Sequence, residues 1–458
     1  MAHIHLIGIG GSGLSAIARL LMERGYTVSG SDKQLSPLTR ELAELGAHIY
    51  AGHASENIQG ADVVVRSSAV PDDNPEVVAA LACGTPVLKR HDFLGELMEE
   101  YLGIAVAGTH GKTTTSTMLA WMLTALGQEP SYILGGVSKN LGTNAHAGKG
   151  RAFVIEADEY DRMFLGLRPD IIVLTVVEHD HPDCYPTMTD YLDAFTAFVQ
   201  LLHPGGLLLT GYDDPIARSF NSQVAADCGS FTYGLDAQAD YTATELTQHP
   251  KGGYAFQASY RGKPLAQVAL QVPGEHNVCN ALAALAVAHQ LNLDLSAAAE
   301  ALGEFAGAGR RFDVLGEAQG ITVINDYAHH PTEIQATLAA ARSRYANRRI
   351  WAVWQPHTYS RTQTLLDRFI TAFGDADEVL VTDIYAARDY DPSFSAAQVV
   401  AQMQHPAAHF TPTLAEATDY LLHHLQSGDV LLVLSAGDAD KISKQVLDTL
   451  THREVNHV

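Results

Sequence analysis

Two glycine-rich turns, well separated along the chain, constrain its fold more than any other feature. The first lies in IHLIGIGGSGLSAIARLL, where Gly8, Gly10 and Gly13 have G-x-G-x-x-G spacing. An apolar strand at 4–7 precedes them, and an amphipathic helix follows. Glycines are needed in such a turn because it is tight and because a phosphate must approach bare backbone at the helix N-terminus. The stretch therefore predicts a strand–turn–helix unit that binds a phosphate group.

The second turn, GTHGKTTT at 108–115, predicts a separate phosphate site. Its backbone N–H groups would cradle phosphate oxygens, Lys112 would reach the terminal phosphates, and Thr113 would bind Mg²⁺. The strict P-loop pattern has a glycine where this chain has Val106. A simple glycine-rich turn with a helix cap is the alternative, but lysine followed by three threonines at a helix start favours nucleotide binding.

Alternation of short apolar strands with helical patterns predicts βαβ units around parallel sheets. We expect an α/β protein of three domains in series. These are a Rossmann-like N-terminal domain at 1–101, a central P-loop-type ATPase domain at 102–309 and a C-terminal Rossmann-like α/β domain at 310–458. Within the central domain, residues 230–272 alternate apolar and polar side chains, as antiparallel hairpins do.

Composition excludes several classes of protein. The formal charge of −23 argues against binding nucleic acid or anionic lipid. There is no apolar run of membrane-spanning length and no pattern of a secretory signal, so we expect no membrane insertion. Cys83, Cys184, Cys228 and Cys279 lack paired or metal-type spacing. This usage is typical of a reduced, cytoplasmic protein.

Acidic clusters follow two strands of the central segment. FVIEADEYD places Glu156 at a strand end, and VVEHDHPD brings Glu178, Asp180 and His181 after another. The carboxyl ends of parallel strands are where α/β sheets bind ligands, and carboxylate oxygens suit Mg²⁺. For flanking acids such as Asp161, a solvated strand end is the simpler interpretation.

Seven motifs in order carry a resemblance to a known family. They are GTHGKTTT, EADE, DHPD, GEHNVCNALAAL, GAGRRFD, DYAHHPTE and QPHTYSRT. The chain resembles the Mur ligases of peptidoglycan synthesis over essentially its whole length. The resemblance implies ATP-dependent ligation of L-alanine to the carboxylate of UDP-N-acetylmuramate through an acyl phosphate, by a monomer or homodimer. It implies ATP and two Mg²⁺ ions, which Mn²⁺ can replace, and no nicotinamide.

The same resemblance implies three groups of binding residues. The UDP-sugar would be bound by Gly8, Gly10, Gly11, Ser12, Gly13, Asp32, Ser67, Ser68 and Arg90. ATP would be bound by Gly108, Thr109, His110, Gly111, Lys112, Thr113, Thr114, His276, Asn277, Asn280, Arg310, Arg311 and Asp326. The amino acid would be bound by Tyr327, His329, His357 and Arg361.

The implied metal ligands are Thr113, Glu156 and His181, with His181 on the second ion. The implied catalytic residues are Lys112, Glu156, His181 and His329, the last as a base for the amine. Asn277 and Asn280 are one i, i+3 step apart, so one helix face can present both to adenine. Capping of that helix by His276 or Asn277 is the structural alternative.

Other functions remain as alternatives. Tyr160 stands where the alanine-adding members commonly have serine, and tyrosine there favours a murein-tripeptide ligase of peptidoglycan recycling. Val176 and Thr358 are further departures from the family pattern. An NAD-dependent oxidoreductase would use the first turn and Asp32, but it leaves the second turn unexplained. A non-catalytic nucleotide sensor would not need Glu156 and His181 together.

Overall fold

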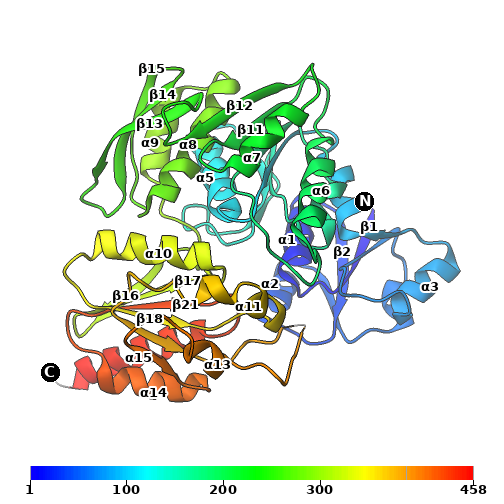
Figure 1. Ribbon diagram of the computed structural model, residues 1–458. Helices are drawn as coiled ribbons and strands as arrows, with labels where there is room; N and C mark the ends of the chain where they lie inside the picture. The colour runs from blue at the N-terminus through cyan, green and yellow to red at the C-terminus, as the bar shows by residue number, and fades with distance from the viewer. Residues whose placement is uncertain (1, 388, 457–458) are drawn as a thin grey trace.

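Three sheets, one after another along the chain, organise the computed structural model (Figure 1). The structure describes residues 2–387 and 389–456. The expected α/β class is confirmed, with three sheets of mainly parallel strands flanked by helices. All four cysteines are free thiols. Within the described ranges, no helix combines the length and the apolar character that crossing a membrane requires.

The first sheet is fully parallel in the order β3-β2-β1-β4-β5. The order reverses between β1 and β4, which is where an open α/β sheet binds its ligand. The elements are β1 His3–Ile7, α1 Ser12–Glu23, β2 Thr27–Asp32, α2 Pro37–Glu44, β3 His48–Ala51, η1 Ser55–Ile58, β4 Val63–Arg66, α3 Pro75–Cys83, β5 Val87–Lys89 and α4 Arg90–Met98.

The central sheet has the order β15-β14-β13-β12-β11-β10-β6-β9-β7-β8. Its elements are β6 Leu102–Ala107, α5 Lys112–Ala125, β7 Ser131–Ile133, β8 Ala145–His146, β9 Ala152–Glu156, η2 Tyr160–Gly166, β10 Ile171–Leu174, α6 Met188–Val199, β11 Leu207–Gly211, α7 Pro215–Ser219, η3 Phe220–Gln223, β12 Gly229–Gly234, β13 Tyr241–Gln248, β14 Tyr254–Tyr260, β15 Lys263–Ala269, α8 Glu275–Gln290 and α9 Leu295–Gly303.

The expected hairpins of the central domain are confirmed for β13, β14 and β15, which pair antiparallel. β12 instead continues the parallel part of the sheet beside β11. The helix α8 is apolar on almost every side because it packs under α5 and α9, with residues 281–288 all buried. β6 lies between β10 and β9, so the turn after β6 opens at the reversal of strand order.

The third sheet has the order β16-β17-β21-β18-β19-β20, antiparallel only between β16 and β17. Its elements are β16 Asp313–Ala318, β17 Ile321–Asp326, α10 Pro331–Arg344, β18 Ile350–Trp354, α11 Tyr359–Thr364, α12 Leu366–Phe369, β19 Glu378–Val381, α13 Ala396–Val400, β20 Ala408–Phe410, α14 Leu414–His424, β21 Val430–Leu434 and α15 Asp440–Asn456.

The two interfaces of the central domain differ in chemistry. One apolar core runs from the N-terminal domain into the central domain, and it joins α1 and α4 to η2 and α6. The backbones meet closely there, since a Cβ on Gly95 would clash with the Gly166 carbonyl. The C-terminal domain keeps its own apolar cores and faces the central domain across α10 (Figure 1). Polar contacts, described below, join these two domains, and such interfaces open more readily than apolar ones.

Candidate active site

The turn after β6 has the backbone geometry of a phosphate loop. Gly108 and Gly111 have φ of +127° and +82°, values that glycine adopts without strain. A Cβ on Gly108 would lie 2.1 Å from the hydroxyl of Thr175, so no larger residue fits there. The loop ends at Lys112, the first residue of α5. Its backbone N–H groups therefore open toward a helix N-terminus, where anions bind.

Lys112 is folded against its own loop and against a buried carboxylate. Its ammonium donates to the carbonyl oxygens of Gly108 at 2.5 Å and Thr109 at 3.1 Å. It also pairs with Glu159, whose side chain is 1% exposed, at 2.8 Å. Burial lowers the pKa of Lys112, but the Glu159 charge and hydrogen bond outweigh it and raise the pKa overall. The lysine therefore stays a cation. Glu159 was not among the predicted site residues.

Thr113 and Glu156 form a second polar pair beside the loop. The Thr113 hydroxyl donates to Glu156 Oε1 at 3.1 Å, and the Gly135 amide donates to Oε2 at 2.8 Å. Burial raises the pKa of Glu156, opposed by the charges of Lys112 and Arg311. A hydroxyl and a carboxylate oxygen are hard donors of the kind that Mg²⁺ accepts at phosphate loops. The two residues therefore fit the predicted metal.

His181 lies at the same site but is not joined directly to Glu156. Its Nε2 is 3.5 Å from Glu159 Oε1, and its Nδ1 is 3.4 Å from Arg361. Its φ is +53°, which places it in a tight polar turn and not inside the strand. The structure thus joins Thr113 to Glu156 and connects His181 to Lys112 through Glu159. The side chain is 17% exposed.

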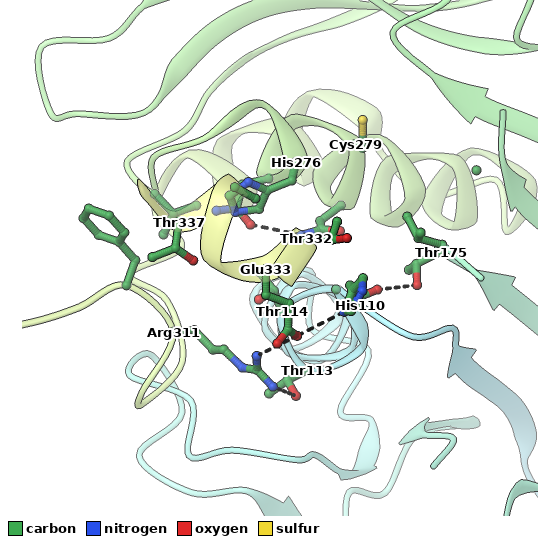
Figure 2. A pocket seen from close by; sticks show the side chains of 18 of the residues that line it. His110, Thr113, Thr114, Thr175, His276, Cys279, Arg311, Thr332, Glu333 and Thr337 are labelled. Atoms are coloured by element: carbon green, nitrogen blue, oxygen red, sulfur yellow. Dashed lines mark hydrogen bonds and ion pairs between the residues drawn. The ribbon is translucent and has the colours of Figure 1, made fainter. Parts of the chain in front are cut away.

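A cavity of about 230 Å³ lies between α5, α8 and α10 (Figure 2). Nine of the predicted ATP-binding residues line it, namely His110, Gly111, Thr113, Thr114, His276, Asn277, Asn280, Arg311 and Asp326. Thr175 and Cys279 also line it and were not predicted. Gly108, Thr109 and Lys112 belong to the same loop but do not line the cavity, and neither does Arg310.

The wall formed by α8 presents the predicted asparagine pair. Asn280 donates to Asn277 at 3.0 Å and accepts from Thr115 at 3.0 Å, so α8 and α5 are tied together. The expectation that one helix face carries both residues is confirmed. The capping alternative is wrong, because Gly274 is the N-cap of α8 and no side chain caps it. Burial lowers the pKa of His276 to about 4, so the imidazole is neutral.

The two adjacent arginines of GRRF have different surroundings. Arg311 lines the cavity and donates to the Thr113 hydroxyl at 3.2 Å (Figure 2). Arg310 donates to the carbonyl oxygens of Ser435 and Gly437 and so anchors the C-terminal domain internally. Asp326 accepts from two backbone amides, and burial raises its pKa to about 6. Arg311 is thus the arginine placed to meet a phosphate.

The first glycine loop is braced by the predicted acid. Asp32 accepts from the Gly10 amide at 2.9 Å, and a Cβ on Gly10 would lie 2.8 Å from that carboxylate. Ser67, in the turn after β4, packs against Gly8. Gly11 begins α1 as its N-cap, Ser12 is the first helical residue, and Ser68 is exposed. The turns after β1 and β4 therefore meet at the reversal of strand order.

A second cavity, of about 110 Å³, joins this loop to the central domain. It is lined by Ser12, Gly13 and Arg90 from the N-terminal domain and by Glu156 and Asp158 from the central one. Burial lowers the pKa of Arg90, opposed by nearby carboxylates, and its guanidinium lies 3.8 Å from Asp158. Arg90 also contacts the Met163 sulfur at 2.9 Å. The cavity therefore leads from the first glycine loop to Glu156.

The predicted amino-acid residues of the C-terminal domain lie close together. The rings of His329 and His357 have centroids 5.6 Å apart, and His329 bonds the Tyr327 carbonyl at 2.9 Å. Arg361 approaches His357 Nδ1 at 3.0 Å and donates to Asp180 of the central domain at 2.7 Å. The Arg361–Asp180 pair is nearly fully buried. Arg361 therefore also acts as a contact between domains, which sequence reasoning missed.

Comparison with known proteins agrees with this architecture. The chain matches three family models, described as Mur ligase family, catalytic domain (residues 3–102), Mur ligase middle domain (106–288) and Mur ligase, glutamate ligase domain (310–437). A UDP-N-acetylmuramate–L-alanine ligase from Alkaliphilus metalliredigens is 41% identical over 98% of this chain and 97% of its own length. One from Pelobacter propionicus is 44% identical over 95% of each chain.

Solved structures resemble the whole chain as well. The crystal structure of UDP-N-acetylmuramate-alanine ligase MurC from Thermotoga maritima has a TM-score of 0.82 at 30% identity, and covers 99% of this chain and 100% of its own. A murein peptide ligase from Psychrobacter arcticus has a TM-score of 0.73 at 27% identity, with 98% and 99% covered. The three sheets and the two glycine loops agree with these relatives, and the chain belongs to the Mur ligase family.

Proposed function

We propose that the protein joins L-alanine to the carboxylate of UDP-N-acetylmuramate in an ATP-dependent reaction of peptidoglycan synthesis. One structural observation carries the proposal. The Thr113–Glu156 pair stands between two cavities, since Thr113 lines the nucleotide cavity and Glu156 lines the cavity that begins at the first glycine loop. A phosphate donor and a sugar-linked acid bound in these cavities would meet at that pair. The L-alanine ligases that cover nearly the whole chain support the choice of substrates.

The reaction needs an activated acyl group, because a carboxylate oxygen leaves poorly at neutral pH. The sugar carboxylate would attack the γ-phosphorus of ATP, forming an acyl phosphate and releasing ADP. The amine of L-alanine would then attack the acyl carbon, and inorganic phosphate would leave with the former carboxylate oxygen. Lys112 and Arg311 supply cationic charge where the phosphoryl group transfers.

We assign one metal ion to Thr113 and Glu156 and a second to Glu156 and His181. Mg²⁺ bound there would neutralise charge on the transferring phosphoryl group. The first assignment rests on the 3.1 Å contact of a hydroxyl with a buried carboxylate. The second rests on the family resemblance and on the place of His181 in the strand-end turn of the same domain, 3.5 Å from Glu159, the ion-pair partner of Lys112. Mn²⁺, which accepts imidazole more readily, would serve as well.

His329 would meet the incoming amine. Burial and the Arg361 charge lower the pKa of His329 to about 3, so its ring is neutral and can accept a hydrogen bond. A general base works best when its pKa is near the working pH. We therefore give His329 the role of orienting the amine, with full proton removal completed by solvent or phosphate. Tyr327 and His357, which flank it, would complete the amino-acid site.

The test is phosphate release by the full-length protein with ATP and UDP-N-acetylmuramate, adding L-alanine, glycine, L-serine or murein tripeptide in turn. Preference for L-alanine is expected. UDP-N-acetylmuramate labelled with ¹⁸O in its carboxylate should transfer one labelled oxygen to the released phosphate. Release of unlabelled phosphate would contradict the acyl-phosphate route, and activity with tripeptide alone would contradict the choice of amine.

A murein-tripeptide ligase is the second candidate, and Tyr160 favours it. The Tyr160 hydroxyl donates to Asp183 at 3.2 Å, and its ring centroid is 5.1 Å from that of His181. Tyr160 thus lies against the acidic turn that carries His181 and Asp183. We place the reaction in the cytoplasm, which the four free thiols favour.

A further inference from the structure

His110, in the middle of the phosphate loop, has a carboxylate on each side of its ring. Nε2 lies 2.5 Å from Glu178 Oε1, and Nδ1 lies 3.2 Å from Glu333 Oε1 (Figure 2 shows the contact with Glu333). Glu178 follows β10 in the central domain, whereas Glu333 is in the first turn of α10 in the C-terminal domain. The ring therefore bridges the two domains. We call these three residues the His110 bridge.

Only an imidazolium carries a proton on both ring nitrogens, so that each N–H faces a carboxylate. Burial lowers the pKa of His110, but the hydrogen bond to Glu178 and the charges of Glu178 and Glu333 outweigh it and raise the pKa to about 9. The bridge is therefore charged at neutral pH. One of its two carboxylates is present only while the C-terminal domain is docked.

The surrounding groups fit this charge state. The His330 ring, 4.6 Å away between centroids, is neutral because burial and the His110 charge lower its pKa to about 4. Arg368 lies 2.9 Å from Glu178. Arg311 and His329 lie 3.8 and 3.4 Å from Glu333. His110, Glu178 and His330 have ligand atoms within 4.8 Å of one another, as metal ligands do, but the short hydrogen bond and the Arg368 pair already satisfy Glu178.

We infer that Glu333 is a positioning residue, which strengthens the cationic form of His110 in the nucleotide site when the C-terminal domain is docked. The inference rests on the proposed function, because it takes the cavity beside His110 to be the ATP site. His110 lines that cavity together with Thr113, Thr114 and Arg311. Docking of the domain that carries the amino-acid residues would thus strengthen the hold on the triphosphate. Binding of ATP would in turn favour the docked arrangement, since such coupling is reciprocal.

Glu333 has a second, purely structural task that the test must leave intact. Its Oε2 accepts from the backbone amides of His329 at 3.1 Å and His330 at 3.3 Å, which closes the capping box of α10. Glutamine at the same position also serves a capping box. Glu333→Gln therefore keeps an acceptor for the cap and removes the charge that faces His110, Arg311 and His329.

The matched control is Glu416→Gln. Glu416 holds the same third position of a capping box, in α14 of the same domain, where it bonds Thr413. It is exposed and is not among the residues of the nucleotide cavity. The control therefore reports what loss of a capping-box charge does by itself.

The experiment titrates His110 in full-length protein with ¹³C-labelled histidine, assigned by the signal missing in His110→Gln. In the wild type we expect the midpoint of the His110 titration near pH 9. In Glu333→Gln it should fall by at least one pH unit, about 1.4 kcal/mol. For a fall of one unit, the KM for ATP should rise about twofold at pH 8 and close to tenfold at about pH 10, and the alkaline limb of kcat/KM for ATP should move to lower pH by the same interval. Glu416→Gln should change none of these.

Two results would overturn the inference. One is an unchanged His110 titration in Glu333→Gln. The other is a shifted titration with an unchanged pH profile and KM for ATP, which would leave Glu333 with its capping task alone. The nuclear magnetic resonance titration needs no turnover, so it separates the two proposals. If the wild type shows the high midpoint but no ATP-dependent ligation, the proposed function fails while the bridge itself stands.

Discussion

The ammonium of Lys112 lies 2.8 Å from the carboxylate of Glu159, and both are withdrawn from solvent. The carboxylate also faces His181 at 3.5 Å and accepts from the Tyr191 hydroxyl at 3.3 Å. Glu159 therefore balances the lysine of the phosphate loop while no phosphate is bound. It also holds the Lys112 side chain at the loop. Mutations at these two residues can therefore distinguish the contribution of Lys112 to catalysis from its contribution to the stability of the fold.

Lys112→Met should reduce turnover roughly 10²–10³-fold, because a cation aimed at the transferring phosphoryl group is lost. The variant should also lose roughly 3 kcal/mol of unfolding free energy, since the buried Glu159 carboxylate loses the cation nearest to it. Phosphate release and urea denaturation measure the two effects. UDP-sugar binding, by calorimetry, should survive.

The double variant Lys112→Met/Glu159→Gln is the control for this prediction. It should recover most of the stability but none of the activity, because both buried charges have been removed. Turnover near the wild-type rate in either variant would contradict the assignment of the phosphate loop.

Gly10→Ala should weaken UDP-sugar binding. The new Cβ would lie 2.8 Å from the Asp32 carboxylate and 3.1 Å from the Thr39 methyl carbon, so the loop has to move. Gly374→Ala is the matched control, since a Cβ there would have no neighbour within 4 Å. Calorimetry with UDP-N-acetylmuramate should show a raised Kd for the first variant only. Tight binding of NADH in place of the UDP-sugar would favour the oxidoreductase alternative.

Glu76→Gln should lower the unfolding free energy at pH 7 by about 3 kcal/mol. Glu76 is fully buried and bonded to Ser31 and Asn57. Burial raises its pKa, but the His5 ring, 3.8 Å away, and the hydrogen bonds from Ser31 and Asn57 outweigh it and lower the pKa from 4.5 to about 2. A depressed carboxylate pKa stabilises the fold above pH 4.5, and the contribution is lost as pH falls toward 2.

Urea denaturation between pH 7 and pH 3 measures this effect. The difference in unfolding free energy between wild type and Glu76→Gln should be constant above pH 5 and shrink below pH 4.5. The exposed Glu56, changed to glutamine, serves as the control and should follow the wild type. A difference that stays the same at every pH would show that the buried hydrogen bonds, and not the charge, account for the stability.

Local sequence predicted the parts of the site that local geometry determines. The glycine loops were found because a positive φ and a close backbone approach leave glycine as the residue that fits, as at Gly108. The family resemblance pointed to Asn277 and Asn280, and helical spacing predicted correctly that they share one face. These features need only a few neighbouring residues, so they can be read along the chain.

Contacts between distant elements could not be predicted in the same way. Arg310 and Arg311 are adjacent in sequence, yet one faces the nucleotide cavity and the other anchors β21. Glu333 and Asp180 act through partners in another domain, His110 and Arg361. A carboxylate that also caps a helix shows only its capping role in sequence. Its second partner is set by how the domains dock.

His181→Ala should raise the concentration of Mg²⁺ or Mn²⁺ needed for half-maximal activity by roughly tenfold or more, because a ligand is lost. Folding should be almost unchanged, since the ring is partly exposed and lies in a turn after the apolar strand β10. Metal titrations of phosphate release and thermal denaturation measure the two effects. His452→Ala, on the exposed face of α15, is the control.

A second substitution tests the chemistry of the ligand. Mg²⁺ prefers oxygen and Mn²⁺ accepts imidazole. His181→Asp should therefore recover part of the Mg²⁺-dependent activity, while the wild type keeps the advantage with Mn²⁺. The new carboxylate would also face Glu159, and this repulsion limits the recovery. A His181→Ala variant that unfolds, or that needs the same metal concentration as the wild type, would show that His181 acts through Glu159 and Arg361 and not through a metal.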